Sequence, residues 1–434
     1  MKFGIVIIDN SRAAGSGGLG AVMGSKNLKA IAVRGNSSIS VKNRQTFNDL
    51  SRKAYTRIQD SQLAKAMSEK GTHGCYSKSM NEICCLPTRN TDDDHWNPSS
   101  MTKTDFTRIV TGNANVIKCD ESYESCYNCP LKCGSVIYRI IEGPYTGLKF
   151  PAFEANVIFA FGSRCDIDDP ASIQKIFEIL SKFGLDNDAA GVVISWAIQC
   201  FQKGILSLED TGGLELTWGN PELVIDLLNK ITYKEGIGSL LARGVREASE
   251  IIGRGSDYYA IHCKGQDNVD ALRAAKGWAF GNVVSLRGGR HLDGAPSTEF
   301  QAIPPELGEK LYGVPTAGDQ TAYEGKGKLT FWYSCFKALV DSLGFCYYTS
   351  YWGDHSLLGP EDYAQLFSAA VGEEFSAQSL LHIGQRIVNV EKTFNTIHKG
   401  FSRQDDLPPK IFTSEKIKTG KYKGHYLDMR EWNS

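Results

Sequence analysis

A compact run of three cysteines constrains this chain more than any other feature of its sequence. Cys126, Cys129 and Cys133 follow one another at a Cys-x2-Cys-x3-Cys spacing, and Gly134 comes directly after the last of them. Three thiolates leave a tetrahedral site one ligand short, so a fourth ligand must come from elsewhere in the chain. The spacing favours an iron–sulfur cluster with four cysteine ligands. A zinc knuckle, which normally pairs two Cys-x2-Cys units, and a set of inert buried thiols are the alternatives that the spacing leaves open.

The charge and the cysteine content narrow the classes of protein to consider. The chain of 434 residues has a formal net charge of −1, so no global positive field indicates nucleic acid or an anionic membrane as a partner. No apolar run approaches the length of a membrane span, and the start of the chain has no cleavable signal architecture. Twelve cysteines are too few for a disulfide scaffold in a chain of this length. We therefore expect reduced thiols, some of them metal ligands, in a cytoplasmic protein.

A glycine-rich stretch lies near the start of the chain, between expected strands at 4–10 and 30–34. Its glycines, within 15–20, match the spacing of the dinucleotide-binding fingerprint. However, the interval to the second strand is short for a helical crossover, and no acidic residue lies near the end of that strand. We therefore discard an NAD-dependent dehydrogenase. Two hypotheses remain: a turn that binds nothing, and a loop of bare N–H groups that, with Arg12 and Lys26, suits a phosphate or pyrophosphate of a cofactor.

Most of the remaining sequence predicts helices. An amphipathic helix is expected from 44 to about 68, followed by an irregular segment over 71–104. Further on, cap residues, prolines at first helical positions and terminal glycines indicate helices that begin or extend over 170–183, 192–203, 221–231, 237–252 and 376–399. Their apolar stripes indicate core positions, and we assign them no chemistry.

Two later segments carry candidate functional residues. His291 lies in a loop of glycines and arginines over 285–294, where a structural role and a catalytic or anion-binding role are both open. Asp341, Gly344 and Cys346 form an Asp-x-x-Gly-x-Cys pattern.

Several separate segments together resemble one family, the aldehyde ferredoxin oxidoreductases, which are tungsten enzymes with a bis-pyranopterin cofactor. The stretch from Gly17 to Ala30 resembles their pterin-binding loop, and Leu86 to Asn90 resembles another of their motifs. The three clustered cysteines resemble their cluster motif, and the Asp-x-x-Gly-x-Cys pattern resembles the motif that ends in a fourth cluster ligand. The resemblance covers essentially the whole chain.

The resemblance supplies assignments that spacing alone does not. It implies that Cys346 completes a [4Fe–4S] cluster with the three motif cysteines. It also implies that Glu154 and His291 lie beside the metal, where a carboxylate and an imidazole can activate a water and protonate an oxygen. The residues that it implies for cofactor binding are Arg12, Gly17, Gly18, Gly20, Lys26, Gly184, Leu185, Asp186, Arg287, Asp341, Leu343 and Gly344.

The chain departs from the family in three places. Ser181 stands where the first pterin motif of the family has an aspartate, and Asp293 stands where some relatives carry a lysine. Relatives also have a β-rich domain ahead of the first pterin loop. We therefore expect a truncated product or one half of a split enzyme, with most of the N-terminal domain missing or supplied by a separate polypeptide.

The fold class expected from the resemblance is mainly α, with two helical domains of the aldehyde ferredoxin oxidoreductase type and an α+β remnant at the N-terminus. The expected boundaries are 1–42 for the remnant of the pterin-binding domain, 43–260 for helical domain 2 with the cluster motif, and 261–434 for helical domain 3 with the fourth cysteine.

The function implied by the resemblance is that of a tungsten (or molybdenum) bis-pterin oxidoreductase. It would oxidise an aldehyde to a carboxylate and pass electrons through the [4Fe–4S] cluster to ferredoxin or another iron–sulfur electron-transfer protein. Two alternatives remain: a catalytic subunit related to the tungsten-dependent benzoyl-CoA reductases, and a non-catalytic cluster-bearing electron-transfer or split-gene subunit. A homodimer is left open, and neither nucleic acid nor a membrane span is expected.

Overall fold

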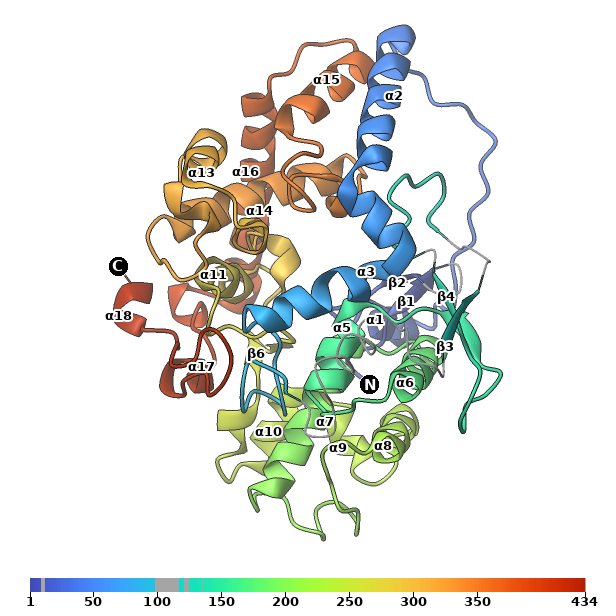
Figure 1. Cartoon of the computed structure of the whole chain (residues 1–434), viewed down its shortest axis with the longest axis vertical. Helices are drawn as coiled ribbons and strands as arrows, with labels where there is room; N and C mark the ends of the chain where they lie inside the picture. Colours follow the sequence, from blue (N-terminus) through green and yellow to red (C-terminus); the bar gives the residue numbers. More distant parts are fainter. Residues whose placement is uncertain (9–11, 98–116, 121–124, 135, 434) are drawn as a thin grey trace.

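Helices make up most of the fold, as the sequence predicted, and the few strands form small separate sheets (Figure 1). The computed structural model describes residues 1–8, 12–97, 117–120, 125–134 and 136–433. Buried apolar side chains from Phe3 to Leu427 form one connected core. Within the described residues, no helix is both long and apolar enough to span a membrane.

The N-terminal segment forms a hairpin rather than the predicted pair of distant strands. Strand β1 (Val6–Ile8) pairs antiparallel with β2 (Arg12–Ala14), and helix α1 (Leu19–Ser25) follows. The strand predicted at 30–34 is wrong, because this segment has no strand partner and its apolar side chains face solvent: Ile31 and Val33 are 70% and 89% exposed. Residues 9 and 10 of the first predicted strand lie outside the described residues.

The helix predicted from 44 to about 68 is two helices, α2 (Arg44–Asp60) and α3 (Gln62–Glu82). Ser61 separates them: its backbone is extended, and its side chain accepts a hydrogen bond from Ala64 N at 3.0 Å, which caps α3. Helix α3 then continues through a kink at Gly71, whose φ is 65° and ψ −178°. The segment from 71 to Glu82 is therefore helical, where the sequence predicted irregular structure.

The middle of the chain contains a group of helices whose ends follow the predicted caps. Asp169 caps α6 (Pro170–Phe183), and Gly184 ends it in a left-handed conformation with φ 64°. Asn220 likewise caps α8. The helix predicted over 237–252 is interrupted at Gly244, whose φ is 85°. The helices of this group are α5 (Ala155–Val157), which continues into a π-helical turn (Ile158–Ser163), α6, α7 (Asn187–Gln202), α8 (Pro221–Tyr233), α9 (Gly238–Leu241) and α10 (Val245–Ile252).

Between α3 and α5 lies a three-stranded antiparallel sheet in the order β3-β4-β5. Its strands are β3 (Ile117–Asp120), β4 (Ile137–Ile140) and β5 (Lys149–Pro151). Strand β4 lies directly after the cysteine motif, and β5 pairs with it from the following turn. The three clustered cysteines lie between β3 and β4.

The last part of the chain packs a second group of helices. Helix α14 (Lys326–Ser342) lies against α16 (Ala377–Lys399), and α15 (Pro360–Val371) joins α16 to α2 at the top of Figure 1. The predicted long helix that ends at Gly400 is confirmed as α16. The other elements of this part are β6 (His262–Cys263), β7 (Gln266–Asp267), α11 (Lys276–Val284), α12 (Thr298–Gln301), α13 (Pro305–Tyr312), α17 (Lys410–Ser414) and α18 (Met429–Trp432).

Candidate functional site

The four predicted cluster cysteines come from two distant parts of the chain. Cys126, Cys129 and Cys133 lie in the turns that precede β4, and Cys346 follows the C-terminal end of α14. Cys126 and Cys346 are exposed, whereas Cys129 and Cys133 are half-buried. The fold therefore presents thiols at its surface, where a cluster could exchange electrons with a partner.

Electrostatic interactions place these thiols in one neighbourhood. Burial raises the pKa of Cys133 to about 12, and the charges of Cys346 and Cys129 contribute to the rise. Burial of its sulfur raises the pKa of Cys346 as well, with contributions from Cys129 and Cys126. Among the described residues, however, no group of three or more Cys, His, Asp or Glu side chains is arranged tightly enough to hold a single metal ion. The thiols are gathered near one another without being closed around one ion.

Arg12 joins the N-terminal hairpin to the cysteine loop and to Glu154. Its Nη1 donates a hydrogen bond to Oε1 of Glu154 at 2.7 Å. Its guanidinium occupies the space beside Gly134, where an added Cβ would lie only 1.2 Å from Nη2 of Arg12. Glu154 in turn contributes to the raised pKa of Cys133, after burial. The predicted catalytic carboxylate is thus paired with a cation that lies against the cysteine loop.

The glycine-rich loop packs closely on the first residues of the chain. An added Cβ on Gly18 would lie 2.2 Å from the carbonyl oxygen of Lys2, and one on Gly20 would lie 2.2 Å from that of Ile5. Gly17, with a φ of 76°, has nothing within 4 Å of the same position. Backbone packing therefore explains two of the three predicted cofactor glycines in this loop, and of these three only Gly17 borders open space.

The segment Gly184–Asp186 meets the glycine-rich loop through residues 3–5. Ile5 N donates to the carbonyl oxygen of Gly184 at 2.8 Å, and Asp186 N donates to that of Phe3 at 3.0 Å. Gly20 N donates to the carbonyl oxygen of Gly4 from the other side at 2.9 Å. Two of the three predicted pterin segments are thereby brought together. Leu185 is buried beneath them.

The third predicted pterin segment lies at a cavity of about 590 Å³ between α14 and α16. Arg287 and Asp341 line this cavity, and both are already paired, Arg287 with Asp293 and Asp341 with Lys337. Although burial alone would raise it, the hydrogen bonds and charge of Arg287 hold the pKa of Asp293 below its usual range. Neither the glycine-rich loop nor Gly184–Asp186 lines this cavity. Leu343 caps the C-terminal end of α14, and Gly344 follows it. Gly344 N donates a hydrogen bond to the carbonyl oxygen of Asp341.

Arg290 is a buried cation whose partners the sequence did not reveal. Its guanidinium contacts three carboxylates: Nη1 lies 2.9 Å from Asp188, and Nη2 lies 3.2 Å from Asp186 and 3.0 Å from Asp267. Burial raises the pKa of Asp188 to about 7, against the opposing charge of Arg290. The acidic residues of 186–188 and 267–270 were visible in the sequence, but only the fold reveals that they converge on one arginine. Asp186 also caps α7, so its carboxylate is fully used.

His291 is held by a carboxylate and two tryptophans. Its Nδ1 lies 2.9 Å from Oδ2 of the buried Asp270. Its ring stacks on Trp278, with centroids 4.8 Å apart and an interplanar angle of 19°, and lies parallel to Trp352 at 6.1 Å and 7°. With Nδ1–H donated to Asp270, Nε2 is the ring atom that can accept a proton. Sequence reasoning missed all three partners, because Trp278 falls on a helix that looks like core and Trp352 has no motif around it.

Of the two predicted catalytic residues, His291 lines a pocket and Glu154 does not. His291 lines a pocket of about 150 Å³ together with Ala155 and Asn156, the two residues that follow Glu154. Glu154 is not among the lining residues, since its carboxylate turns to Arg12. His291 therefore lines the pocket beside the two residues that follow Glu154, while the side chains of His291 and Glu154 have different partners.

The comparisons with known proteins agree on one family. The family model described as "Aldehyde ferredoxin oxidoreductase, domains 2 & 3" matches residues 49–434, and that described as "Aldehyde ferredoxin oxidoreductase, N-terminal domain" matches residues 1–35. A tungsten-containing aldehyde ferredoxin oxidoreductase of Pyrococcus furiosus is 30% identical over 433 residues, and that of Pyrococcus abyssi is 29% identical over 435. Each match covers 99% of this chain and 67% of the relative, so the chain spans about two thirds of the length of these curated relatives.

Two further similarities are more distant or more partial. A protein of Pyrococcus furiosus named "Aliphatic sulfonate oxidoreductase, WOR-like subunit" is 31% identical over 300 residues, which are 67% of this chain and 46% of that protein. Among solved structures, the active-site complex BamBC of benzoyl coenzyme A reductase, in complex with 1,5-dienoyl-CoA, aligns with a TM-score of 0.71 at 21% identity. That alignment covers 94% of this chain and 65% of the other, and it shows a shared fold.

Proposed function

The chain belongs to the aldehyde ferredoxin oxidoreductase family, and we propose that it is a tungsten (or molybdenum) bis-pterin oxidoreductase that converts an aldehyde to a carboxylate. The observation that carries this proposal is the cysteine loop itself: Arg12 lies against it while bonded to Glu154, and the charge of Cys346, more than two hundred residues further along the chain, contributes to the raised pKa of Cys133. A buried, inert set of thiols would not require exposed members, and two of these thiols are exposed.

The four cysteines fit a [4Fe–4S] cluster in the chemistry of their donors and in their neighbourhood. Cubane clusters are held by four cysteine thiolates, and this set supplies four. The charges of these thiols contribute to one another's raised pKa values, which supports a shared neighbourhood. Cys126, Cys129, Cys133 and Cys346 would hold it, and its electrons would pass to ferredoxin or another iron–sulfur protein.

The pterins would be held largely by backbone and by a few cations. Gly17, exposed Lys26 and the segment Gly184–Asp186 would meet one of them, because residues 3–5 bring these segments together. Arg287 and Asp341 would meet the other at the cavity between α14 and α16. For Gly18, Gly20 and Asp186, close packing and capping limit the contribution to backbone N–H groups and to the shape of the loop.

When bound, the tungsten centre would supply the two-electron chemistry and the oxygen that aldehyde oxidation requires. The residues of this chain would manage protons around it. Asp270 fixes the ring of His291, so Nε2 can take the proton that leaves as the carbonyl carbon is oxidised. Arg12 holds Glu154 by a hydrogen bond from Nη1 to Oε1, and the carboxylate held in this way can orient or deprotonate a water. The tryptophans beside His291 exclude bulk water from the imidazole.

The test is metal content followed by activity. The chain is purified without oxygen, and iron, tungsten and molybdenum are measured in the same sample. We expect four iron atoms per chain, as one cubane requires, together with one tungsten or molybdenum atom and aldehyde-dependent reduction of a viologen dye. Cys346→Ser should lose the cluster absorbance and iron. Cys335→Ala, a buried cysteine near the middle of α14, is the matched control and should retain both.

Other outcomes assign the alternatives. Iron without tungsten or molybdenum would fit a cluster-bearing electron-transfer subunit. Zinc in place of iron would remove the cluster. A pterin–metal preparation that reduces an aryl-CoA ester but ignores aldehydes would move the chain to the aryl-CoA reductases, for which the present support is a shared fold.

A further inference from the structure

A small pocket beside His291 is lined by several aromatic side chains. It measures about 150 Å³ and lies where α3, the π-helical turn, α11, α12 and the segment 348–353 meet. The aromatic side chains among its lining residues are Tyr76, Phe159, Trp278, Phe300, Tyr348 and Trp352. An engineered apolar cavity of the same volume is known to admit benzene, so this space suits one six-membered ring.

Three of the rings around this pocket have nearly parallel planes. Trp278 and His291 differ by 19°, His291 and Trp352 by 7°, and the two tryptophans by 25°. Phe300 is tilted by 58° against Trp278, with centroids 4.4 Å apart. A flat ring can stack in an offset manner on the parallel rings and make an edge contact with the tilted one. A puckered ring or a flexible chain cannot make both kinds of contact.

Two buried polar atoms of the lining residues have no hydrogen-bond partner within the described part of the chain. They are Nε1 of Trp278 and Oδ1 of Asp270. Trp278 is 4% exposed and Asp270 is 1% exposed, so bulk solvent does not satisfy them. Unpartnered buried polar atoms at a pocket indicate a ligand or an ordered water. An indole N–H is a donor only, so a ligand there must offer an acceptor such as a carbonyl oxygen.

We propose that this pocket binds a planar aromatic ring that carries a carbonyl group. The proposal rests on the proposed function in one respect, namely that a carbonyl compound is the substrate, and it narrows that substrate to aryl carbonyl compounds. An aromatic aldehyde and an aromatic thioester share this chemistry. In either compound the ring would lie against Trp278 and Trp352, with its carbonyl group toward His291.

The experiment measures binding, so it does not depend on turnover. Ligand-observed NMR titrations of the purified protein, without an electron acceptor, compare benzaldehyde with cyclohexanecarbaldehyde and hexanal. Benzaldehyde should bind about three- to tenfold more tightly than cyclohexanecarbaldehyde, because aromatic contacts add to the effect of area alone. S-benzoyl-N-acetylcysteamine forms the thioester arm. Equal or weaker binding of both benzoyl probes relative to the aliphatic aldehydes overturns the proposal.

Variants locate the binding. Ser79 is exposed and lines the pocket, so Ser79→Trp should fill its edge and weaken benzaldehyde binding at least tenfold. Lys78→Trp, the exposed neighbour on α3 that does not line the pocket, is the matched control and should leave binding unchanged. A second variant, Phe300→Ala, enlarges the pocket and should shift the preference from benzaldehyde toward 2-naphthaldehyde. Unaltered benzaldehyde affinity in Ser79→Trp, or unaltered preference in Phe300→Ala, refutes the assigned site.

The failure of this proposal and that of the proposed function have different signatures. Ring-selective binding in a protein that contains no tungsten or molybdenum would retain the aryl pocket and reject the oxidoreductase function. Aldehyde-dependent turnover without ring selectivity would do the reverse. Binding of the thioester alone, the aldehyde alone or both retains the aryl carbonyl site and identifies which compound supplies the ring.

Discussion

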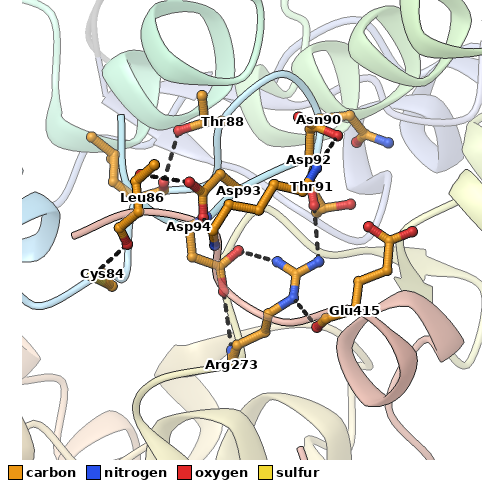
Figure 2. A network of polar contacts seen from close by, with 12 residues as sticks. Cys84, Leu86, Thr88, Asn90, Thr91, Asp92, Asp93, Asp94, Arg273 and Glu415 are labelled. Carbon is orange, nitrogen blue, oxygen red and sulfur yellow. Dashed lines mark hydrogen bonds and ion pairs between the residues drawn. The ribbon is translucent and has the colours of Figure 1, made fainter. Parts of the chain in front are cut away.

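Removal of the Arg273 guanidinium should destabilise the fold more than the removal of an exposed ion pair does. Arg273 and Asp94 are both fully buried, with 0% of either side chain exposed, and Nη1 lies 2.5 Å from Oδ1 (Figure 2). The same guanidinium donates to the carbonyl oxygens of Thr91 and Glu415, each at 2.9 Å. It thus joins the segment before residue 97 to the C-terminal part of the chain.

The magnitude follows from what Arg273→Met leaves behind. Among the described residues, the carboxylate of Asp94 keeps the hydrogen bond from the backbone N of residue 273, at 3.2 Å, while the buried carbonyl group of Thr91 and the part-buried one of Glu415 each lose a donor. Breaking a buried pair by removing one partner costs about 3–5 kcal/mol of unfolding free energy. With a urea slope of about 3 kcal/mol per molar, the unfolding midpoint should fall by roughly 1 M or more.

The pH dependence has a defined sign. Burial raises the pKa of Asp94, and the charge of Arg273 opposes that rise. Without Arg273 the folded-state pKa rises further above the unfolded value of about 4. When the pKa of an acid is higher in the folded state than in the unfolded state, the acid destabilises the fold fully at a pH above the folded-state pKa. The destabilisation disappears at a pH below the unfolded-state pKa. The deficit of the variant should therefore be larger at pH 8 than at pH 5.

The assay is urea unfolding followed by far-ultraviolet circular dichroism at both pH values. Arg246→Met is the control, since Arg246 and its partner Glu250 are 52% and 58% exposed, and it should cost at most about 1 kcal/mol. The double variant Arg273→Met/Asp94→Asn should recover part of the loss, because no buried charge is left unpaired. The reasoning would be refuted if Arg273→Met lost no more unfolding free energy than the control, or if its loss grew on acidification.

Three further predictions concern the candidate site. Gly20→Ala should lower the free energy of unfolding by an overpacking cost of about 1–3 kcal/mol, because the added Cβ would lie 2.2 Å from a carbonyl oxygen. Gly24→Ala, in the same helix, places its Cβ in open space and should be neutral or stabilising. Thermal unfolding of the two variants tests the difference. Arg290→Met should destabilise the fold by about 3–5 kcal/mol at pH 8, because it leaves buried carboxylates without their cation. The loss should be smaller at pH 5, because burial raises the pKa of Asp188 to about 7 and its protonation at pH 5 removes an unpaired charge. Urea unfolding at both pH values tests this difference. His291→Gln should retain metal but lose turnover about a hundredfold or more, and unchanged steady-state rates in metal-replete protein would remove its role as a base.

Local signals in the sequence predicted local structure well. The starts of α6 and α8 followed from Asp169-Pro170 and Asn220-Pro221, because a cap and a proline act within one turn. The mainly helical class and the family were likewise accessible from the sequence. The strand at 30–34 was mistaken because β-branched residues indicate a strand only where a partner strand exists.

Pairings between distant residues were out of reach. The sequence named Glu154 and His291 as candidate residues without revealing which side chains would pair with them. The structure pairs Glu154 with Arg12, and it buries Arg290 among three aspartates. Such partners are chosen by the approach of helices that no local pattern encodes, and the aromatic surroundings of His291 were hidden for the same reason.

The attachment of residues 2–5 has a consequence for synthesis on the ribosome. Lys2 N donates to the carbonyl oxygen of Ala242, and Ile5 N donates to that of Gly184. These acceptors are translated long after the residues that bind them. At about 5–20 residues per second, the segment waits on the order of 10 to 50 s before its last partner exists. During that interval residues 2–5 lack the acceptors that hold them in the folded protein, so a nascent-chain chaperone has its longest opportunity to bind this segment.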